Sequence, residues 1–227
     1  MTSPWRWGGS CVVLMALHGA SGCAQAPVPP SSRPSTTPAT PAIVSADTTG
    51  AALIPAGFGS LRQDAIAITL SLPDMLVRLT PLDESVIRTL SSDSYRALRE
   101  LADSRKPALT RLAAQHGLLR GSVWTVSFYG LTRDARFSPL DVTISSAGRD
   151  YRPVEVLPIS SGFGEQRLQP RETQSALYLF DDALDVNQPL VISMGSTQSN
   201  AWSTTTLRTI ERERALIRSR AQSRPAP

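Results

Sequence analysis

The sequence has 227 residues, of which 41% are hydrophobic, and this is enough for one domain of ordinary size with its own core. The 23 basic and 19 acidic residues give a net charge of +4, but the arginines are scattered among acids, which argues against a nucleic-acid-binding protein. The two cysteines are Cys11 and Cys23, so removal of a signal containing Cys11 leaves no possible internal disulfide.

The first predicted element is an export signal at residues 1–23. Arg6 precedes seven apolar residues, Cys11 to Leu17, a run too short to span a bilayer, and small residues follow it. The run Ala20-Ser21-Gly22-Cys23 resembles the lipobox of bacterial lipoproteins. The resemblance implies that the thiol of Cys23 takes a diacylglyceryl group, that the preceding peptide is removed and that the new amino terminus is acylated. The alternative is plain secretion with cleavage near Ala24.

The position after Cys23 bears on the destination of a lipoprotein. The resemblance implies that an Asp at this position retains many lipoproteins at the inner membrane, and here the residue is Ala24. We therefore expect a protein at the outer membrane, or facing the periplasm, if the host has an outer membrane.

Residues 24–50 are predicted to form a disordered tether. This segment has six prolines, many Ser and Thr, and no aromatic residue, so it cannot bury enough apolar surface to fold. The folded domain is expected at residues 51–204.

The domain is expected to open with strands and then to carry a helical insertion. Ile66, Ile68, Leu70 and Leu72 alternate with smaller residues at period two, and Met75 to Thr80 continues the β pattern. Between residues 81 and 117 the apolar spacing becomes helical, which predicts three short helical pieces that fold onto the sheet.

After Gly121 the spacing predicts strands again, with no helix between them. The predicted strands are 124–129, 140–144, 151–157, 174–180, the innermost one, and 190–194. Short strands at intervals of ten to fifteen residues indicate an antiparallel β-sandwich rather than a parallel sheet.

The stretch Ser122 to Gly195 resembles the immunoglobulin-like domains of bacterial envelope lipoproteins. The resemblance lies in FSPLDVTISSAGRDYRPVEV followed by LQPRETQSALYLFDDALDVNQPLVI. It implies a strand, a tight Gly turn, an edge strand, and a polar bend that leads into an aromatic-rich strand. The fold class predicted is thus mainly β, an immunoglobulin-like sandwich with a helical insertion and a C-terminal helix.

The C-terminal region, 205–227, is predicted to be a helix followed by a tail. Leu207, Ile210, Ile217 and Ala221 form a narrow apolar stripe that we expect to dock on the edge of the sandwich after Trp202. The alternative is that its arginines contact lipid headgroups or wall polymer.

Two groups of residues are candidates for chemistry. His116 is the only histidine after the signal, and its spacing places it on the apolar face of a helix, which favours a structural role over acid/base catalysis. Asp181, Asp182, Asp185 and Asn187 crowd oxygen ligands after a strand and form a weak candidate for Ca²⁺, without the spacing of an EF-hand. No catalytic residue and no cofactor is predicted.

Three functions are compatible with these observations. The first is a non-enzymatic lipoprotein, held to the membrane through Cys23, that binds another envelope protein or wall polymer. The second is an envelope hydrolase or wall-modifying enzyme that uses acids and His116. The third is a structural spacer that contacts wall polymer or lipid through its basic C-terminal helix.

Overall fold

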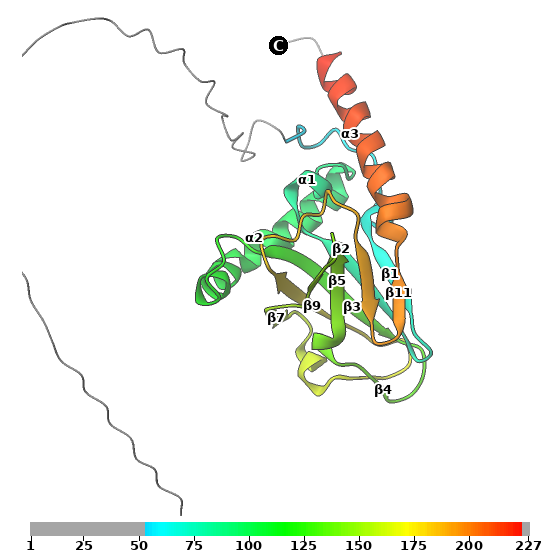
Figure 1. Ribbon diagram of the computed structural model, residues 1–227. Helices are drawn as coiled ribbons and strands as arrows, with labels where there is room; N and C mark the ends of the chain where they lie inside the picture. Colours follow the sequence, from blue (N-terminus) through cyan, green and yellow to red (C-terminus); the bar gives the residue numbers. More distant parts are fainter. Residues whose placement is uncertain (1–52, 224–227) are drawn as a thin grey trace, which may run out of the picture. The chain divides into compact units, whose positions relative to one another are not determined.

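A computed structural model describes residues 53–223 of the protein (Figure 1). The predicted signal with Cys23 and the predicted tether at 24–50 lie outside the described residues. The strands are β1 (Ile68–Ser71), β2 (Met75–Pro81), β3 (Ser122–Gly130), β4 (Ala135–Arg136), β5 (Val142–Ser146), β6 (Arg149–Tyr151), β7 (Glu155–Pro158), β8 (Arg167–Leu168), β9 (Thr173–Phe180), β10 (Val191–Met194) and β11 (Thr197–Ser199). The helices are α1 (Glu84–Ile87), α2 (Ser92–Gln115) and α3 (Leu207–Gln222).

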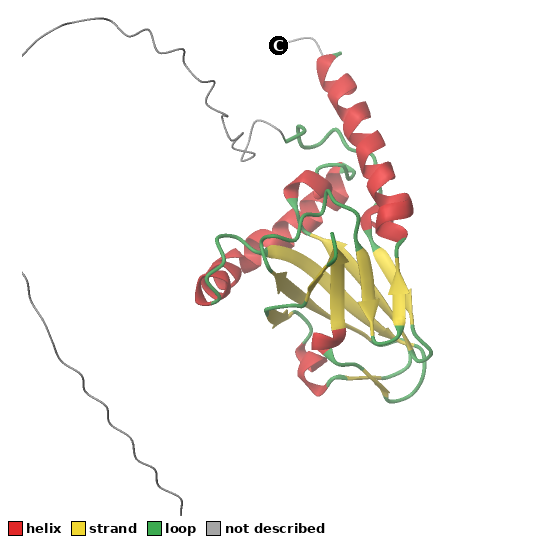
Figure 2. Ribbon diagram, viewed as in Figure 1, coloured by secondary structure: helices red, strands yellow, loops and turns green. Residues whose placement is uncertain are grey.

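The strands form two antiparallel sheets and a short ribbon (Figure 2). The five-stranded sheet has the order β1-β2-β3-β9-β7, the four-stranded sheet has the order β11-β10-β5-β6, and β4 pairs with β8. The prediction of a mainly β protein with antiparallel sheets and a C-terminal helix is confirmed. The strand β9, predicted to be innermost, is internal, but β3 is the central strand of its sheet.

One hydrophobic core is shared by the two sheets. Trp124, Val126 and Phe128 alternate along β3 and are fully buried, and Ile144 of β5 and Ile192 of β10 belong to the same cluster. Burial of a large apolar side chain contributes about 1.5–3 kcal/mol, so the alternation along β3 fixes which face of the sheet points inward.

A tight turn joins β5 to β6, as the sequence predicts. Ala147 and Gly148 have φ angles of 50° and 77°, and such paired left-handed residues give the twist that a two-residue hairpin needs. The chain then changes sheets around Pro153, so the single strand predicted at 151–157 is in fact two edge strands, β6 and β7, in different sheets. Proline lacks an N–H for a ladder hydrogen bond, which is why pairing stops there.

The helical insertion contains two helices, not the three pieces predicted. Asp83 caps α1 by accepting a hydrogen bond from the Ser85 N–H at 2.8 Å, and α2 then runs without a break through Pro107. Proline removes only one hydrogen bond, that to the Asp103 carbonyl, and packing of α2 along Leu98, Leu109 and Ala113 holds the helix on either side.

The C-terminal helix docks on the domain through a buried side. A π-helical turn, Trp202–Thr206, leads into α3, and Trp202, Ile210 and Ile217 are completely buried. The predicted docking is therefore confirmed, but the stripe includes two charged residues, Glu213 and Arg214, that are also buried. Of the helices in residues 53–223, none has the length and hydropathy that a membrane span requires.

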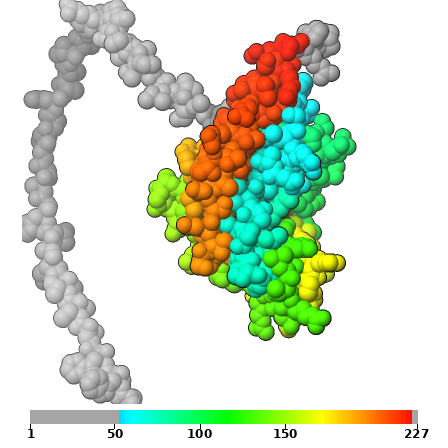
Figure 3. Space-filling view, turned by 90° about the vertical axis from the view of Figure 1, so that its right-hand side faces the viewer, coloured from blue at the N-terminus to red at the C-terminus, as the bar shows by residue number. Residues whose placement is uncertain are grey.

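Glu213 and Arg220 of α3 hold the residues that lead into the domain, 54–62, which we term the entry segment. Glu213 Oε1 accepts hydrogen bonds from the backbone N–H and the hydroxyl of Ser60, both at 2.9 Å, and Arg220 donates to the Phe58 carbonyl at 2.7 Å. On its other side Gly59 is so close to the residues that follow α1 that a Cβ there would lie 2.3 Å from the Thr89 carbonyl oxygen. Figure 3 shows the orange-to-red α3 lying along the cyan segment.

Candidate functional site

A groove of about 470 Å³ runs beside α2, between this helix and the start of β3. Its apolar lining consists of Leu82, Ala102, Leu109, Ala113, Leu119 and Val123. Its polar lining consists of Glu84, Arg99, Asp103, Lys106, Thr110 and Arg120. This volume is within the range of small-molecule sites, which are mostly apolar with a few placed polar groups. We refer to it as the α2 groove.

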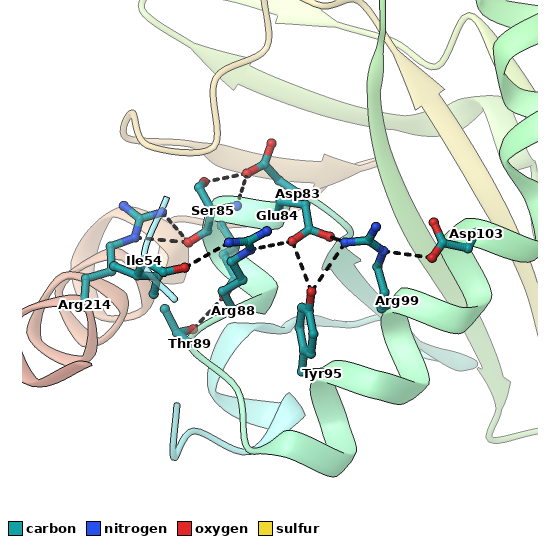
Figure 4. Close-up of polar contacts among 11 residues, drawn as sticks. Ile54, Asp83, Glu84, Ser85, Arg88, Thr89, Tyr95, Arg99, Asp103 and Arg214 are labelled. Carbon is teal, nitrogen blue, oxygen red and sulfur yellow. Dashed lines mark hydrogen bonds and ion pairs between the residues drawn. The ribbon is translucent and has the colours of Figure 1, made fainter. Parts of the chain in front are cut away.

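Glu84 is the centre of a polar network at one end of the α2 groove (Figure 4). Its carboxylate accepts hydrogen bonds from Arg88 Nε at 2.7 Å, from Arg99 and from the Tyr95 hydroxyl at 3.4 Å. Arg88 also donates to the Ile54 carbonyl at 3.1 Å, so the network reaches the entry segment. These contacts exist because α1 and α2 meet at an angle that brings Glu84 over the first turns of α2.

Arg99 links the two acids of the groove. It pairs with Glu84 and donates from Nε to Asp103 Oδ2 at 2.8 Å, four residues further along α2. The hydrogen bond to Asp103 and the charge of Glu84 raise the pKa of Arg99 above its ordinary value, so the guanidinium stays charged. The acids of the groove are thereby already matched with positive charge.

Two other cations of the groove have no such partner. Lys106 and Arg120 are exposed, and within residues 53–223 neither side chain makes a hydrogen bond or an ion pair. Lys106 projects from the middle of α2, and Arg120 belongs to the loop between α2 and β3. The groove thus combines an apolar lining with two cations that are available to a ligand.

The loop that carries Arg120 is shaped by glycines. Gly121 has a φ of 73°, and a Cβ there would lie 2.4 Å from Leu179 Cδ1, so both conformation and space require glycine. Leu119, next to Arg120, is 93% exposed, the most exposed large apolar side chain in the described chain. Leu119 and Arg120 also border an adjoining hollow of about 330 Å³, lined in addition by Asp83 and Asp182.

The four residues predicted as weak Ca²⁺ ligands do not converge. Asp181 Oδ1 accepts from the Ala183 N–H at 2.9 Å and its Oδ2 lies 3.3 Å from Arg149. Asp185 Oδ1 accepts from both the N–H and the side-chain amide of Asn187, at 2.8 Å each. These carboxylates stabilise their own turns. Within residues 53–223 no set of three or more His, Cys, Asp or Glu side chains is arranged to hold a metal ion.

Addition of Ca²⁺ is expected to leave the thermal unfolding midpoint of the protein unchanged. A ligand that binds only the native state raises the midpoint in a concentration-dependent way, and the Asp181 and Asp185 carboxylates are already engaged in local hydrogen bonds. The measurement is a calorimetric scan at several Ca²⁺ concentrations, with Mg²⁺ as the ionic-strength control. A rise with Ca²⁺ alone would contradict this reading of the loop.

His116 is at the C-terminal end of α2, but not on its buried face as predicted. Its side chain is 38% exposed, and Nε2 lies 3.5 Å from a carboxylate oxygen of Glu155 in β7. The prediction assumed that the helical spacing continues through His116, but the helix ends at Gln115. His116 therefore caps the helix and turns away from the apolar stripe. Neither His116 nor Glu155 lines the α2 groove.

The α2 groove was not predicted from the sequence. The available signal was the run Leu118-Leu119-Arg120 between Gly117 and Gly121, an apolar pair held in a tight loop. Comparisons with models of protein families, with curated proteins and with solved structures found no match.

Proposed function

We propose that this chain is a lipid-anchored protein of the bacterial cell envelope that is not an enzyme and that binds another envelope component. The observation that carries the proposal is the order of segments: an apolar run, Ala20-Ser21-Gly22-Cys23, a proline-rich stretch at 24–50, and then a domain. An acyl anchor followed by a proline-rich tether places a domain near a membrane without inserting it. Ala24 after the cysteine favours the outer membrane where the host has one.

The α2 groove supports binding in preference to catalysis. Its two acids, Glu84 and Asp103, are both engaged by Arg99, and what remains available is apolar surface with Lys106 and Arg120. Such groups hold a ligand by burial and charge, whereas a hydrolase needs a base within reach of a nucleophile. The third function, a spacer that binds through its C-terminal helix, is less favoured. The apolar side of α3 is buried against the domain, and Arg214 donates a hydrogen bond to the Ser85 carbonyl of the same domain.

The order of the strands supports an immunoglobulin-like sandwich. In that fold one sheet has the order A-B-E-D and the other has G-F-C, extended by C′ in some members. The order β2-β3-β9-β7 matches A-B-E-D, and β11-β10-β5-β6 matches G-F-C-C′, in the correct chain sequence. On this assignment α1 and α2 are an insertion between strands A and B, and β1 is an added edge strand.

Replacing Cys23 with serine is expected to move the protein from the detergent-soluble membrane fraction to the aqueous fraction, or to leave it as an uncleaved precursor. Each buried CH₂ of an acyl chain contributes about 0.8 kcal/mol, and two or three chains hold a protein almost permanently, whereas none would remain in the variant. The measurement is phase partitioning of cell extracts followed by immunoblotting and intact mass.

Cys11→Ser is the matched control for this experiment. Cys11 belongs to the segment that precedes the lipobox, so its loss leaves acylation of Cys23 and the fractionation unchanged. The anchor would be contradicted if Cys23→Ser partitioned between the detergent and aqueous fractions as the parent does and the mature parent protein had the mass of an unlipidated chain. Plain secretion would then be the explanation.

A further inference from the structure

The chain reverses direction at the end of α2 in a way that turns Leu119 outward. The Leu118 N–H donates to the Ala113 carbonyl at 2.9 Å, and the Gly117 N–H donates to the Ala114 carbonyl at 3.1 Å. In this type of helix end, the residue after the left-handed glycine packs back on the last turn, and the half-buried Leu118 has that position. Leu119 comes one residue later and is 93% exposed.

Two glycines fix the backbone on either side of Leu119. Gly117 and Gly121 have φ angles of 69° and 73°, which other residues adopt only with strain. The outward position of Leu119 therefore follows from the path of the backbone. Exposure of a single leucine is ordinary on a protein surface, so the meaning of this one depends on what surrounds it.

The second half of α2 and the loop after it are positively charged. No acid occurs from residue 104 to residue 121, whereas residues 92–103 contain three. The same stretch contains four cations whose side chains make no hydrogen bond or ion pair within residues 53–223: Arg105, Lys106, Arg111 and Arg120.

The acids nearby leave this charge largely uncompensated. Four acids border the α2 groove and the adjoining hollow: Asp83, Glu84, Asp103 and Asp182. Asp83 caps α1, and Glu84 and Asp103 pair with Arg99. In the part of the chain that the structure describes, only Asp182 of these four has no such partner. One free acid stands against four free cations, so this end of α2 has a net positive charge.

The range of electrostatic interactions decides which cations act together with Leu119. Arg120 is its neighbour in the sequence, and Arg111 precedes the end of α2 at Gln115 by about 6 Å along the helix axis. Lys106 precedes that end by about 14 Å. Charges in solution are screened beyond about 8 Å at physiological ionic strength. A surface that meets Leu119 therefore interacts with Arg111 and Arg120 and only weakly with Lys106. We term residues 111–121 the α2 tip.

We propose that the α2 tip docks on the surface of an anionic phospholipid bilayer, with Leu119 among the acyl chains and with Arg111 and Arg120 against the headgroups. Apolar side chains flanked by cations are what binding at a membrane surface requires. The end of α2 projects beyond the sheets, where a flat surface can reach it (Figure 1).

A bilayer suits the α2 tip better than a protein partner does. A stable protein interface buries about 800 Å² on each partner, and the end of one helix with a short loop is small for this. A bilayer makes no such demand, because the acyl anchor already holds the chain at the surface and raises the effective concentration of the tip there. The inference rests on the proposed function for this proximity and goes beyond it, since docking would also fix the orientation of the domain.

The test is photo-labelling of the full-length acylated protein, reconstituted through its anchor on vesicles that contain a phospholipid with a diazirine in its acyl chain. The vesicles consist of phosphatidylcholine alone or of equal parts phosphatidylcholine and phosphatidylglycerol. Flotation reports the anchor, and mass spectrometry maps the adducts. Adducts are expected within residues 117–121 on the anionic vesicles, with much weaker labelling of these residues on the neutral ones.

Two variants remove the two contributions to docking. Leu119→Ala should lower labelling of the tip about 60-fold, because three carbons are lost and each buried CH₂ contributes about fourfold. Its control is Leu140→Ala, since Leu140 is 61% exposed and lies outside the tip. The double variant Arg111→Gln, Arg120→Gln should lower labelling on anionic vesicles about 25-fold, because each cation near such a surface contributes about fivefold.

The control for the double variant is Arg212→Gln, Arg218→Gln, which removes two exposed cations of α3. Within residues 53–223 the side chains of these arginines also have no partner, and labelling of the tip should stay at the parent level. A loss of labelling in this control equal to that in the Arg111→Gln, Arg120→Gln variant would overturn the proposal, because docking would then depend on the overall charge and not on the tip.

The outcomes for anchor and tip are distinguishable. Protein that floats with both kinds of vesicle but has no adduct within residues 117–121 would overturn the docking and leave the anchor standing. Protein that does not float with neutral vesicles but is labelled at the tip on anionic ones would contradict the anchor and support the docking. Equal labelling of the tip on the two kinds of vesicle would overturn the role of Arg111 and Arg120. Retention on isolated wall polymer that depends on these two arginines, without labelling by vesicles, would replace the bilayer by that polymer.

Discussion

Replacing Trp202 with alanine is expected to lower the free energy of unfolding by about 3–5 kcal/mol, the usual cost of removing a large aromatic ring from a core. Trp202 is completely buried, its ring centroid lies 5.6 Å from that of Trp124, and its Nε1 donates to the Val186 carbonyl at 3.1 Å. The substitution creates a cavity and leaves that buried carbonyl without its donor. Urea-induced unfolding followed by circular dichroism measures the loss.

Leu216→Ala is the control for this experiment. Leu216 is on α3, the helix that follows the turn of Trp202, but it is 45% exposed, so its truncation should change the free energy of unfolding by no more than about 0.5 kcal/mol. If Trp202→Ala were as stable as Leu216→Ala, α3 would not be part of the cooperative core. The arginines of α3 would then favour its alternative use, contact with anionic lipid or wall polymer.

Replacing Glu213 with glutamine is expected to lower the free energy of unfolding at neutral pH by about 2 kcal/mol, because charge-assisted hydrogen bonds are stronger than neutral ones. The Glu213 carboxylate is 5% exposed and accepts from Ser60 and from Arg220 Nη1, the latter at 2.8 Å. Glutamine keeps an acceptor for Ser60 but loses the ion pair with Arg220. Denaturant titration at pH 7 measures the difference.

The same carboxylate makes stability depend on pH. Burial by itself would raise the pKa of Glu213, but hydrogen bonds from Arg220 and from Ser60 outweigh it, so the folded-state pKa is lowered. A lowered folded pKa means that the carboxylate stabilises the fold above its unfolded pKa of about 4.3, and that this stabilisation is lost as the pH falls through the lower folded value.

The difference in stability between the parent and Glu213→Gln should therefore shrink as the pH falls below about 4. Glu211→Gln is the matched control, since Glu211 is a 54% exposed acid of the same helix that pairs with Arg214. A constant difference between parent and Glu213→Gln across this pH range would show that the carboxylate's charge does not hold the entry segment.

The strands were predictable because their signal is local. Alternation along β3, with Trp124, Val126 and Phe128 at period two, already specifies a half-buried strand, and Ala147-Gly148 specifies the hairpin turn. The docking of α3 on the domain was predictable from the apolar stripe along the helix, which includes the buried residues Ile210 and Ile217. In each case neighbouring residues in the sequence are neighbours in the element, so a short window contains the information.

The helical insertion marks where local signals fail. Pro107 predicts the start of a separate helical piece, yet α2 runs through it, because packing against the sheet outweighs the loss of one hydrogen bond. The prediction for His116 was wrong for the same reason, since the orientation of His116 depends on where α2 ends and not on its spacing from the apolar residues.

The sequence by itself determined the antiparallel β character, the apolar faces of the strands and the docking side of α3, because each follows from periodicity within one element. Only the tertiary structure decided that Glu213 is a buried acceptor for Ser60, 153 positions away, and that Lys106 and Arg120 share one groove. Those relations depend on how α2, α3 and the entry segment pack on the sheets. Packing of this kind brings residues that are far apart in the chain into contact, and periodicity within one element carries no information about such contacts.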